Sequence, residues 1–387
     1  MRNRLAVPAF AAAVFLASCS SKDGGTTDPV AKIASKTRVS KQSAGDLNRS
    51  RQTAHKYVFN RPEHVKGIYL TAWSAGSRAM RERLLDMVDR TELNSVVIDV
   101  RDEGRMFFKT GIALADESHA LKLAVARPDA LFESLEKHKI WPIARIACFR
   151  DDFVPIQHPE LAVQLKNGKI WKDRAHNSWL DPYNQKNWDY LAQTVEYALD
   201  LGFPEIQLDY VRFPSEGKSS TQVFPAKKAY ASKATLNEDV ISAFARFIGD
   251  KVHARKAIFS ADIFGIISST KGDEGIGQQL EKVAAPFDVL SPMVYPSHFA
   301  RGEYGVKDPN RSPYDIVLKS LSDFKKRLPK VTVRPWLQDF SLAGVHYGAA
   351  EVQDQIRAAR EVGYDGFLVW NSKSKYDESA FQVKGGQ

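Results

Sequence analysis

The chain has 387 residues, of which 43% are apolar, 11% aromatic and 26% charged. It is long and apolar enough to bury a large core, and this composition excludes a disordered protein. The formal net charge of +9 is concentrated at one end, because residues 1–61 hold 11 Lys and Arg against three Asp, while residues 62–387 hold 44 basic and 43 acidic side chains. The folded part is therefore nearly neutral, and nucleic acid is not expected as a partner.

The N-terminus is typical of an exported bacterial lipoprotein. Two arginines precede an apolar run that ends in Leu16-Ala17-Ser18-Cys19, which resembles a lipobox. We expect residues 1–19 to be a signal peptide with Cys19 as the lipidated residue, and residues 20–61 to be a flexible basic tether. A lipid anchor would attach the protein to a membrane of the cell envelope, and Ser20 favours the outer membrane over the inner one. The alternative is an ordinary secretory signal with an incidental cysteine.

From residue 62 to residue 380, apolar strand-like runs alternate with segments of helical period, which predicts one domain. Strands are predicted at Val65–Trp73, Ser95–Arg101, Trp141–Phe149, Glu205–Pro214, Ala257–Phe264, Val289–Tyr295, Thr332–Phe340 and Gly366–Asn371. Helices are predicted at Ser77–Glu92, from Pro128 onward, and at Lys186–Leu201, Leu236–His253, Gly277–Ala285, Pro313–Leu328 and Ala349–Val362. Eight such alternations predict a single α/β domain with the (β/α)8 TIM-barrel fold.

The alternative fold is an open, doubly wound parallel sheet. Sheets of that kind that bind dinucleotides carry G-x-G-x-x-G after the first strand. The only glycine cluster, at residues 272–277, has a different spacing and lies between a strand and a short helix. The sequence therefore favours the barrel and gives no reason to expect a cofactor.

The active site of a (β/α)8 barrel lies where its strands end. Carboxylates, arginines and other polar or aromatic side chains gather in those positions: Tyr69, Trp73, Asp99, Arg101, Arg145, Arg150, Gln207, Asp209, Arg212, Asp262, Ser291, Tyr295, Gln338, Asp339, Trp370 and Asn371. The fourth strand is the most informative, because Asp209 and Arg212 interrupt an apolar run in which an unpaired charge would be costly. We expect Arg212 to keep Asp209 ionised. The alternative is a structural ion pair between the two.

Carboxylates beside aromatic side chains are what glycoside cleavage requires. One carboxylic acid protonates the leaving oxygen, a second carboxylate attacks the sugar or activates water, and aromatic faces stack on sugar rings. Asp209 and Asp262 end neighbouring strands and are the candidate pair, with Asp339 as a third carboxylate. The side chains expected to contact substrate are Tyr69, Trp73, Asp99, Arg101, Arg150, Gln207, Arg212, Tyr295, Trp336, Gln338, Trp370 and Asn371.

Metal-dependent hydrolysis is a weaker alternative. The first predicted strand lacks an H-x-H motif, and no histidine ends a predicted strand. Beyond Cys19 the sequence holds one cysteine, Cys148, in an apolar run typical of core packing. We expect no metal and a monomeric protein.

Four motifs resemble the bacterial glycoside hydrolase-like family DUF4015: KGIYLT at residues 66–71, VIDVRD at 97–102, IQLDYVRFP at 206–214 and GFLVWN at 366–371. The resemblance covers about residues 65–371, and its most specific part is Asp-Tyr-x-Arg-Phe-Pro. That family is distantly similar to the α-amylase and α-galactosidase barrels. The resemblance therefore implies a barrel enzyme that hydrolyses an oligosaccharide or polysaccharide. Neighbouring strand ends could bring Asp209 and Asp262 within the ~5–5.5 Å of a retaining pair, and an inverting reaction, with about 6.5–9.5 Å, is the alternative.

On the pattern of those barrels, Asp209 matches the nucleophile on the fourth strand and Asp262 the position of the acid/base on the fifth. Asp339 falls where the amylases keep a third aspartate that stabilises the transition state. The amylases use Glu on the fifth strand, whereas this chain has the shorter Asp262. Since a fold hosts many functions, a non-catalytic glycan-binding lipoprotein on the same scaffold is the alternative.

Overall fold

The computed structural model describes residues 56–230 and 236–385. The predicted signal peptide, the lipobox Cys19 and the tether up to residue 55 lie outside the described residues. Packing begins at Tyr57, which is buried and stacks on Phe132 with ring centroids 5.3 Å apart. The packed part of the chain therefore starts before the predicted boundary at residue 62. Within the described ranges, every helix is too short or too polar to cross a membrane.

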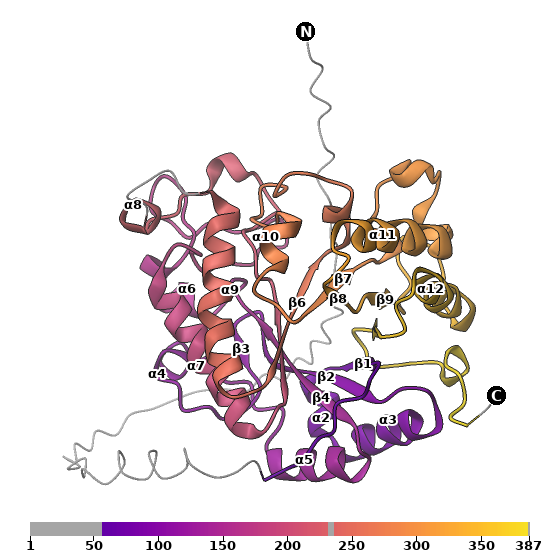
Figure 1. The fold of residues 1–387 in the computed structure, drawn as a ribbon. Coiled ribbons are helices and arrows are strands. Elements are labelled where there is room, and N and C mark those ends of the chain that lie inside the picture. Colours follow the sequence, from indigo (N-terminus) through magenta and orange to yellow (C-terminus); the bar gives the residue numbers. More distant parts are fainter. Residues whose placement is uncertain (1–55, 231–235, 386–387) are drawn as a thin grey trace, which may run out of the picture.

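Eight parallel strands close into a barrel (Figure 1). They are β1 (Lys66–Leu70), β2 (Ser95–Asp102), β4 (Trp141–Ala147), β5 (Glu205–Asp209), β6 (Ile258–Phe264), β7 (Val289–Met293), the interrupted pair β8 (Thr332–Val333) and β9 (Trp336–Gln338), and β10 (Phe367–Trp370). Closure follows from β1, which pairs with both β2 and β10. A short β3 (Arg105–Met106) is antiparallel to β2. The predicted (β/α)8 barrel is confirmed.

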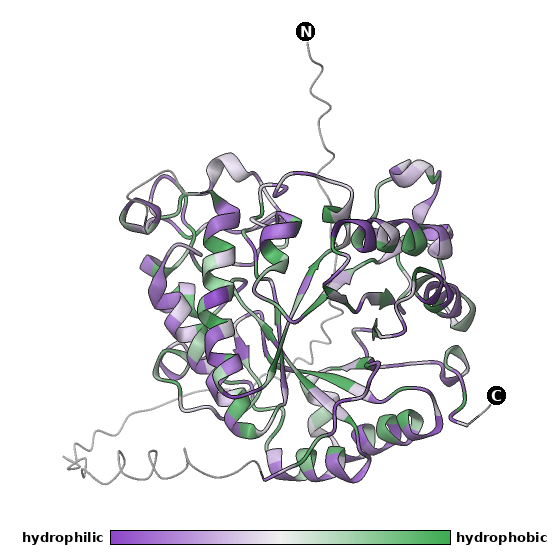
Figure 2. Ribbon diagram, viewed as in Figure 1, coloured by the Kyte–Doolittle hydropathy of each residue, from purple (hydrophilic) through white to green (hydrophobic). Residues whose placement is uncertain are grey.

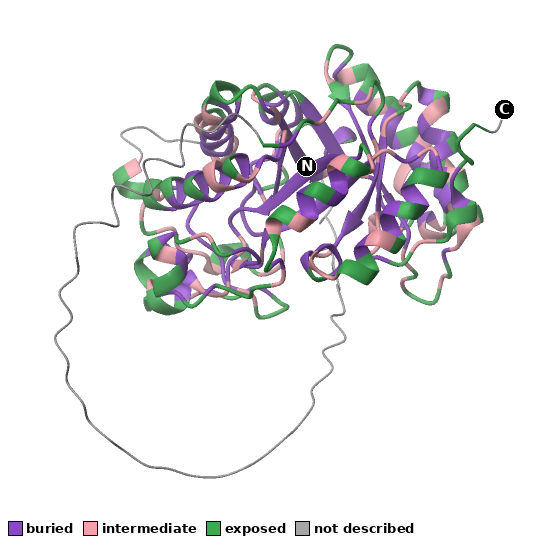
Figure 3. Ribbon diagram, turned by 90° about the horizontal axis from the view of Figure 1, so that it is seen from below, coloured by how far each residue is buried: buried purple, intermediate pink, exposed green. Residues whose placement is uncertain are grey.

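Helices surround the strands, and Figure 2 shows apolar residues along the strands and on one side of the longer helices. The helices are α2 (Ala72–Gly76), α3 (Arg78–Arg90), α4 (Ala113–Glu117), α5 (Pro128–Lys137), α6 (Val154–Gln157), α7 (Gln185–Leu201), α8 (Lys227–Tyr230), α9 (Asn237–Ala254), α10 (Leu280–Ala284), α11 (Pro313–Arg327) and α12 (Ala349–Val362). Figure 3 shows buried strands and helices exposed on their outer sides. This is the layering expected when amphipathic helices cover a parallel barrel.

A buried ion pair occupies the end of the barrel where the strands begin. The carboxylate of Glu205 lies 2.5 Å from Nη2 of Arg334 and accepts hydrogen bonds from Trp141 Nε1 at 2.8 Å and Ser260 Oγ at 2.7 Å. These partners satisfy the buried charge, and the Arg334 guanidinium helps to hold the pKa of Glu205 below its ordinary value against the effect of burial. Pro335 follows Arg334 and cannot donate a ladder hydrogen bond, which fits the break between β8 and β9 in the predicted strand 332–340.

Six predicted strands end earlier than expected, the first and the fourth by the most. The first ends at Leu70, and the chain then forms α2, whose N-cap Thr71 accepts a hydrogen bond from the backbone N–H of Ser74. The fourth ends at Asp209, since the next residue, Tyr210, has a left-handed φ of 48°. Asp209 is thus the last residue of β5, at the mouth of the barrel.

Candidate active site

Carboxylates from three strands converge on one guanidinium at the barrel mouth. Nη1 of Arg145, on β4, lies 2.6 Å from Oδ1 of Asp99 and 3.3 Å from Oδ1 of Asp102. Oδ2 of Asp209 accepts from Nη2 at 2.5 Å and from Nε at 3.0 Å. Oδ2 of Asp262 lies 4.0 Å from the same Nε. One buried cation therefore faces four carboxyl groups.

Strand register explains why these residues meet. Asp99 pairs directly with Arg145 across β2 and β4, and Arg145 pairs with Gln207 across β4 and β5. Asp209 lies two residues beyond Gln207 and so points to the same face of the sheet. Because Leu208 pairs with Ala261, Asp209 and Asp262 follow as neighbours at the ends of β5 and β6.

The two predicted catalytic carboxylates lie close together. Oδ2 of Asp209 and Oδ2 of Asp262 are 3.0 Å and 4.0 Å from one nitrogen atom, so these oxygens are at most 7.0 Å apart, the sum of the two distances. Retaining glycosidases separate their carboxyl groups by about 5–5.5 Å, and inverting ones by about 6.5–9.5 Å. The geometry is compatible with either arrangement and excludes a widely separated pair.

Asp262 is the more buried member of the pair, with 2% of its surface exposed. Burial and the nearby Asp209 raise the pKa of Asp262 well above its ordinary value. Trp336 opposes this shift, because its indole Nε1 donates a 2.6 Å hydrogen bond to Oδ1 of Asp262. The raised pKa favours the protonated form of Asp262, which is the form that can donate a proton.

Asp209 is held through both of its oxygens. Oδ2 binds Arg145, and Oδ1 accepts a 2.6 Å hydrogen bond from the backbone N–H of Tyr210. The main chain is fixed as well, since the carbonyl oxygen of Asp209 accepts from the N–H of Cys148 at 2.7 Å. These contacts fix both the side chain and the main chain of Asp209.

Arg212 has a different partner from the one expected. Its Nη2 lies 2.8 Å from Oε1 of Glu216, and its guanidinium stacks over Trp179 and Phe264 at 4.9 and 4.6 Å from the ring centroids. The expected pairing of Arg212 with Asp209 is not formed, because the left-handed turn at Tyr210 carries the chain out of the strand before Arg212. Arg145 pairs with Asp209 instead.

Aromatic rings cover one side of the cluster. The Tyr69 hydroxyl donates a hydrogen bond to Oδ2 of Asp99, and the Tyr69 ring stacks on Trp370 with centroids 3.9 Å apart. The Arg145 guanidinium lies 5.0 Å from the centroid of Trp370. Burial raises the pKa of Asp99 to about 7, against the opposing effect of Arg145.

Asp339 directly follows β9 at the same end of the barrel. It is 9% exposed, and its backbone N–H donates to the carbonyl of Trp370 at 3.0 Å. Burial, together with Asp377, raises the pKa of Asp339 to about 7. Asn371 braces this corner by donating a 2.5 Å hydrogen bond to the carbonyl oxygen of Asp339. Asp339 is therefore a second group that changes its charge near neutral pH.

Two of the arginines expected to contact substrate are bound to other protein groups. Arg101 is fully buried, pairs with Asp151 and donates to the carbonyl of Cys148 at 2.9 Å. Arg150 donates to Glu103 and to the Tyr210 hydroxyl, both at 2.6 Å. Arg101 supports the barrel wall behind the mouth, whereas Arg150 braces the residue that follows Asp209.

Of the other residues predicted to contact substrate, some are buried in the barrel and one is exposed at its rim. Gln207 is buried and donates to Ser291 at 2.9 Å across the barrel, and Gln338 binds the backbone of residues 297 and 340. Tyr295 is buried and packs edge-on against Phe340. Trp73, on α2, is 58% exposed. Trp73 is thus the predicted aromatic that has a free face.

Arg145 was predicted to lie at a strand end but was not among the residues expected to act on substrate, and Tyr210 was in neither group. Arg145 carried a usable signal, since it interrupts the apolar run 143–149 in the way that Asp209 interrupts its own strand. Tyr210 carried none, because a left-handed tyrosine is not visible in a sequence pattern.

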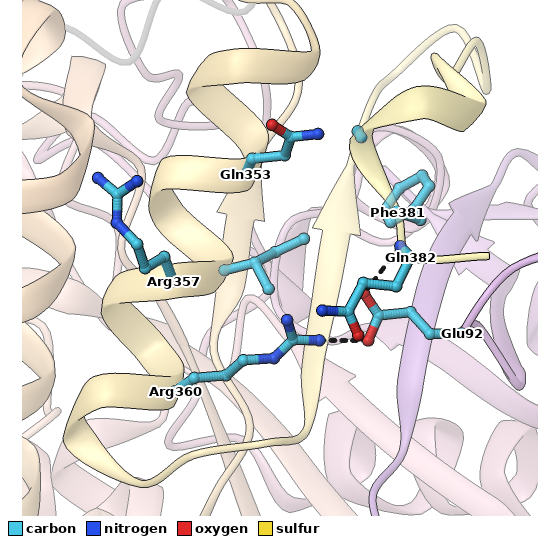
Figure 4. A pocket seen from close by; sticks show the side chains of 8 residues that line it. Glu92, Gln353, Arg357, Arg360, Phe381 and Gln382 are labelled. Carbon is cyan, nitrogen blue, oxygen red and sulfur yellow. Dashed lines mark hydrogen bonds and ion pairs between the residues drawn. The ribbon is translucent and has the colours of Figure 1, made fainter. Parts of the chain in front are cut away.

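Two further features lie away from the mouth. Asp86, Asp89 and His138 have metal-ligand spacing, but they lie near the C-terminal ends of α3 and α5, which lead to the start of β2 and β4. A groove between α12 and the C-terminal segment is lined by Glu92, Gln353, Ile356, Arg357, Arg360, Ala380, Phe381 and Gln382 (Figure 4). Within it Arg360 points to Glu92, just before β2 begins. Neither feature belongs to the strand-end cluster.

Comparison with solved structures gives the same fold. The glycoside hydrolase domain of PgaB (BpsB) from Bordetella bronchiseptica aligns over 80% of this chain and 94% of its own, with a TM-score of 0.61 and 11% identity. The α-galactosidase TtGalA from Thermus thermophilus, in complex with stachyose, aligns over 84% of this chain and 65% of its own, with a TM-score of 0.51 and 14% identity. A hypothetical protein from Ruminiclostridium thermocellum is 32% identical over 52% of this chain and 99% of its own, with a TM-score of 0.46.

None of the curated proteins matches the sequence. The family model described as "Putative glycosyl hydrolase domain", DUF4015, matches residues 67–376. That range holds every strand-end residue described above, and it spans most of the 387 residues. The chain belongs to the DUF4015 family of glycosyl hydrolase-type barrels.

Proposed function

We propose that this protein hydrolyses a glycosidic bond of an oligosaccharide or polysaccharide through Asp209 and Asp262. Family membership assigns the chain to the glycosidases and implies a carbohydrate substrate. The observation that carries the residue assignment is that both carboxylates face Nε of Arg145, at 3.0 and 4.0 Å. Their environments differ in the direction that acid and nucleophile require.

The division of labour follows from those environments. Asp209 accepts hydrogen bonds on both oxygens, which suits a nucleophile, and the raised pKa of Asp262 suits a proton donor. In the first step Asp209 bonds to the anomeric carbon while Asp262 gives its proton to the departing oxygen. In the second step water replaces Asp209 and gives a proton back to Asp262, so configuration is retained. Asp339 orients the sugar.

The exposed indole of Trp73 supports binding of a sugar at the rim. Its side chain is 58% exposed on α2, directly after β1. A free indole face can stack on the apolar face of a sugar ring. We assign Trp73 to a subsite outside the bond-breaking centre.

We also propose that Cys19 carries a lipid that anchors the protein to the cell envelope, more readily the outer membrane than the inner. The proposal rests on the lipobox-like sequence that ends at Cys19. Metabolic labelling with a radioactive fatty acid tests it. Label should appear in the wild-type protein and be absent from Cys19→Ser, and equal labelling of both would overturn the proposal.

A panel of aryl α- and β-glycosides and of polymeric glycans tests the hydrolysis. We expect the wild type to release product from at least one of them, with retention of configuration by NMR, and Asp209→Asn to lose that activity. If Asp209→Asn cleaved the same glycan at the wild-type rate, the proposed role of Asp209 would be refuted. Tight binding of a glycan without products, unchanged when Asp209 and Asp262 are both replaced by Asn, would instead identify a glycan-binding protein.

A further inference from the structure

Arg145 differs from three other arginines of the barrel in how its guanidinium is satisfied. Its Nε, Nη1 and Nη2 each face a carboxylate oxygen. In Arg101, Arg150 and Arg334, by contrast, Nε is buried without a hydrogen-bond partner among the described residues. The full set of bonds to Arg145 comes from β2 and β5, so the guanidinium bridges two strands that are not neighbours.

The β2 side of this bridge is rigid. Asp99 is 2% exposed, binds Nη1 through Oδ1 and accepts from the Tyr69 hydroxyl through Oδ2. The rings of Tyr69 and Trp370 stack on each other, and each faces the guanidinium, at 6.0 and 5.0 Å from its carbon. A planar guanidinium held at its edge by carboxylates and over its face by aromatic rings has little freedom to turn.

The β5 side of the bridge is the proposed nucleophile. Nε and Nη2 both donate to Oδ2 of Asp209, while the Tyr210 N–H holds Oδ1. A lysine ammonium at this position could reach one carboxylate as a point charge but could not reproduce the fork. The orientation of the Asp209 carboxylate is therefore determined by the guanidinium and by one backbone N–H.

We propose that Arg145 is a positioning residue of the reaction, which fixes the orientation of the Asp209 carboxylate by anchoring it to Asp99. This inference rests on the proposed function, since it concerns how the nucleophile is prepared. The titratable groups that face Arg145 are Tyr69 on β1, Asp99 and Asp102 on β2, Asp209 on β5 and Asp262 on β6. Without the guanidinium, the acidic members of this set repel each other and are protonated at higher pH.

The test compares Arg145→Met and Arg145→Lys with the matched control Arg334→Met. Arg145 and Arg334 are each 3% exposed and each ion-paired inside the barrel, at its opposite ends. Thermal unfolding and crystal structures of all three variants show what each substitution does to stability and to the Asp209 side chain. Kinetics are measured on whichever aryl glycoside of the panel the wild type cleaves.

We expect Arg145→Met to lower kcat by about 10²- to 10³-fold, the range found when a preorganised donor is removed, with a smaller change in KM. The acid limb of its pH profile should move up by about one unit or more. Arg145→Lys, which keeps the charge, should leave that limb near its wild-type position and lose part of kcat. Arg334→Met should lose similar stability without moving the limb.

An Asp209 carboxylate that keeps its orientation in crystals of Arg145→Met would overturn the inference. So would equal losses of kcat and equal pH profiles in Arg145→Met and Arg334→Met, which would make Arg145 merely structural. These outcomes are separate from failure of the proposed function. If the wild type cleaves no glycan while Asp209 turns in Arg145→Met, the positioning stands and the glycosidase reaction does not.

Discussion

The backbone N–H of Tyr210 lies 2.6 Å from Oδ1 of Asp209, and Tyr210 adopts a φ of 48°. For a bulky residue this left-handed conformation is unfavourable and persists only where the surroundings enforce it. Here the Tyr210 carbonyl accepts from the N–H of Phe149, and its hydroxyl accepts from Arg150 at 2.6 Å. The strained residue thus aims an amide at the carboxylate that we assign as nucleophile.

Comparing Tyr210→Asn with Tyr210→Val separates the effect of the backbone conformation at residue 210 from the effect of losing the ring. Both substitutions remove the ring, but asparagine tolerates a left-handed φ whereas a β-branched valine resists it. We expect Tyr210→Val to be less stable than Tyr210→Asn by about 1–2 kcal/mol and to have the lower kcat, measured by urea unfolding and by glycoside hydrolysis. Equal stabilities and equal rates would show that the conformation of residue 210 is irrelevant to Asp209.

Trp336→Phe should extend activity to higher pH. The Trp336 N–H stabilises the ionised form of Asp262 and so lowers a pKa that burial and Asp209 have raised. Removal of this bond raises the pKa of Asp262 further, so the acid stays protonated to higher pH and the basic limb of kcat/KM moves upward. The pH–rate profiles of wild type and variant measure the shift, and a basic limb that moves downward would contradict the proton-donor role of Asp262.

Asp339→Asn should change how stability depends on pH. The pKa of Asp339 is raised from 3.8 to about 7, so between these values the folded protein binds more protons than the unfolded chain. Stability from this group is complete below pH 4 and is lost as pH rises through 7, by roughly 4 kcal/mol at most at about 1.4 kcal/mol per unit. Urea unfolding at pH 4.5 and 7.5 should show a smaller loss in Asp339→Asn than in the wild type.

Asp209 and Arg212 show which parts of the site can be predicted from the sequence and which cannot. The alternation of apolar runs gives the barrel, and a carboxylate that interrupts the fourth run gives the position of Asp209 at a strand end. The partner of Asp209 depends on register, which sets Arg145 beside it, and on the φ of Tyr210, which turns Arg212 toward Glu216. The periodicity of the sequence predicts neither the strand register nor the φ of Tyr210, because tertiary contacts determine both.

The acid/base assignment can be tested by the leaving group. Asp262→Asn should leave kcat/KM for a dinitrophenyl glycoside nearly intact, because that leaving group needs no proton, and should lower kcat/KM for a glycoside with a sugar leaving group by about 10²- to 10⁴-fold. Its kcat for the dinitrophenyl glycoside should fall, because the second step has lost its general base. Azide should rescue the variant by attacking the glycosyl-enzyme without a general base, which gives a glycosyl azide of retained configuration. Asp339→Asn, which replaces another carboxyl group of raised pKa at the same end of the barrel, is the matched control. Its losses should be similar for both leaving groups and should not respond to azide. If the leaving-group dependence and the rescue occur in Asp339→Asn instead, the proton donor is Asp339, and the burial of Asp262 beside Trp336 serves only to hold the mouth of the barrel together.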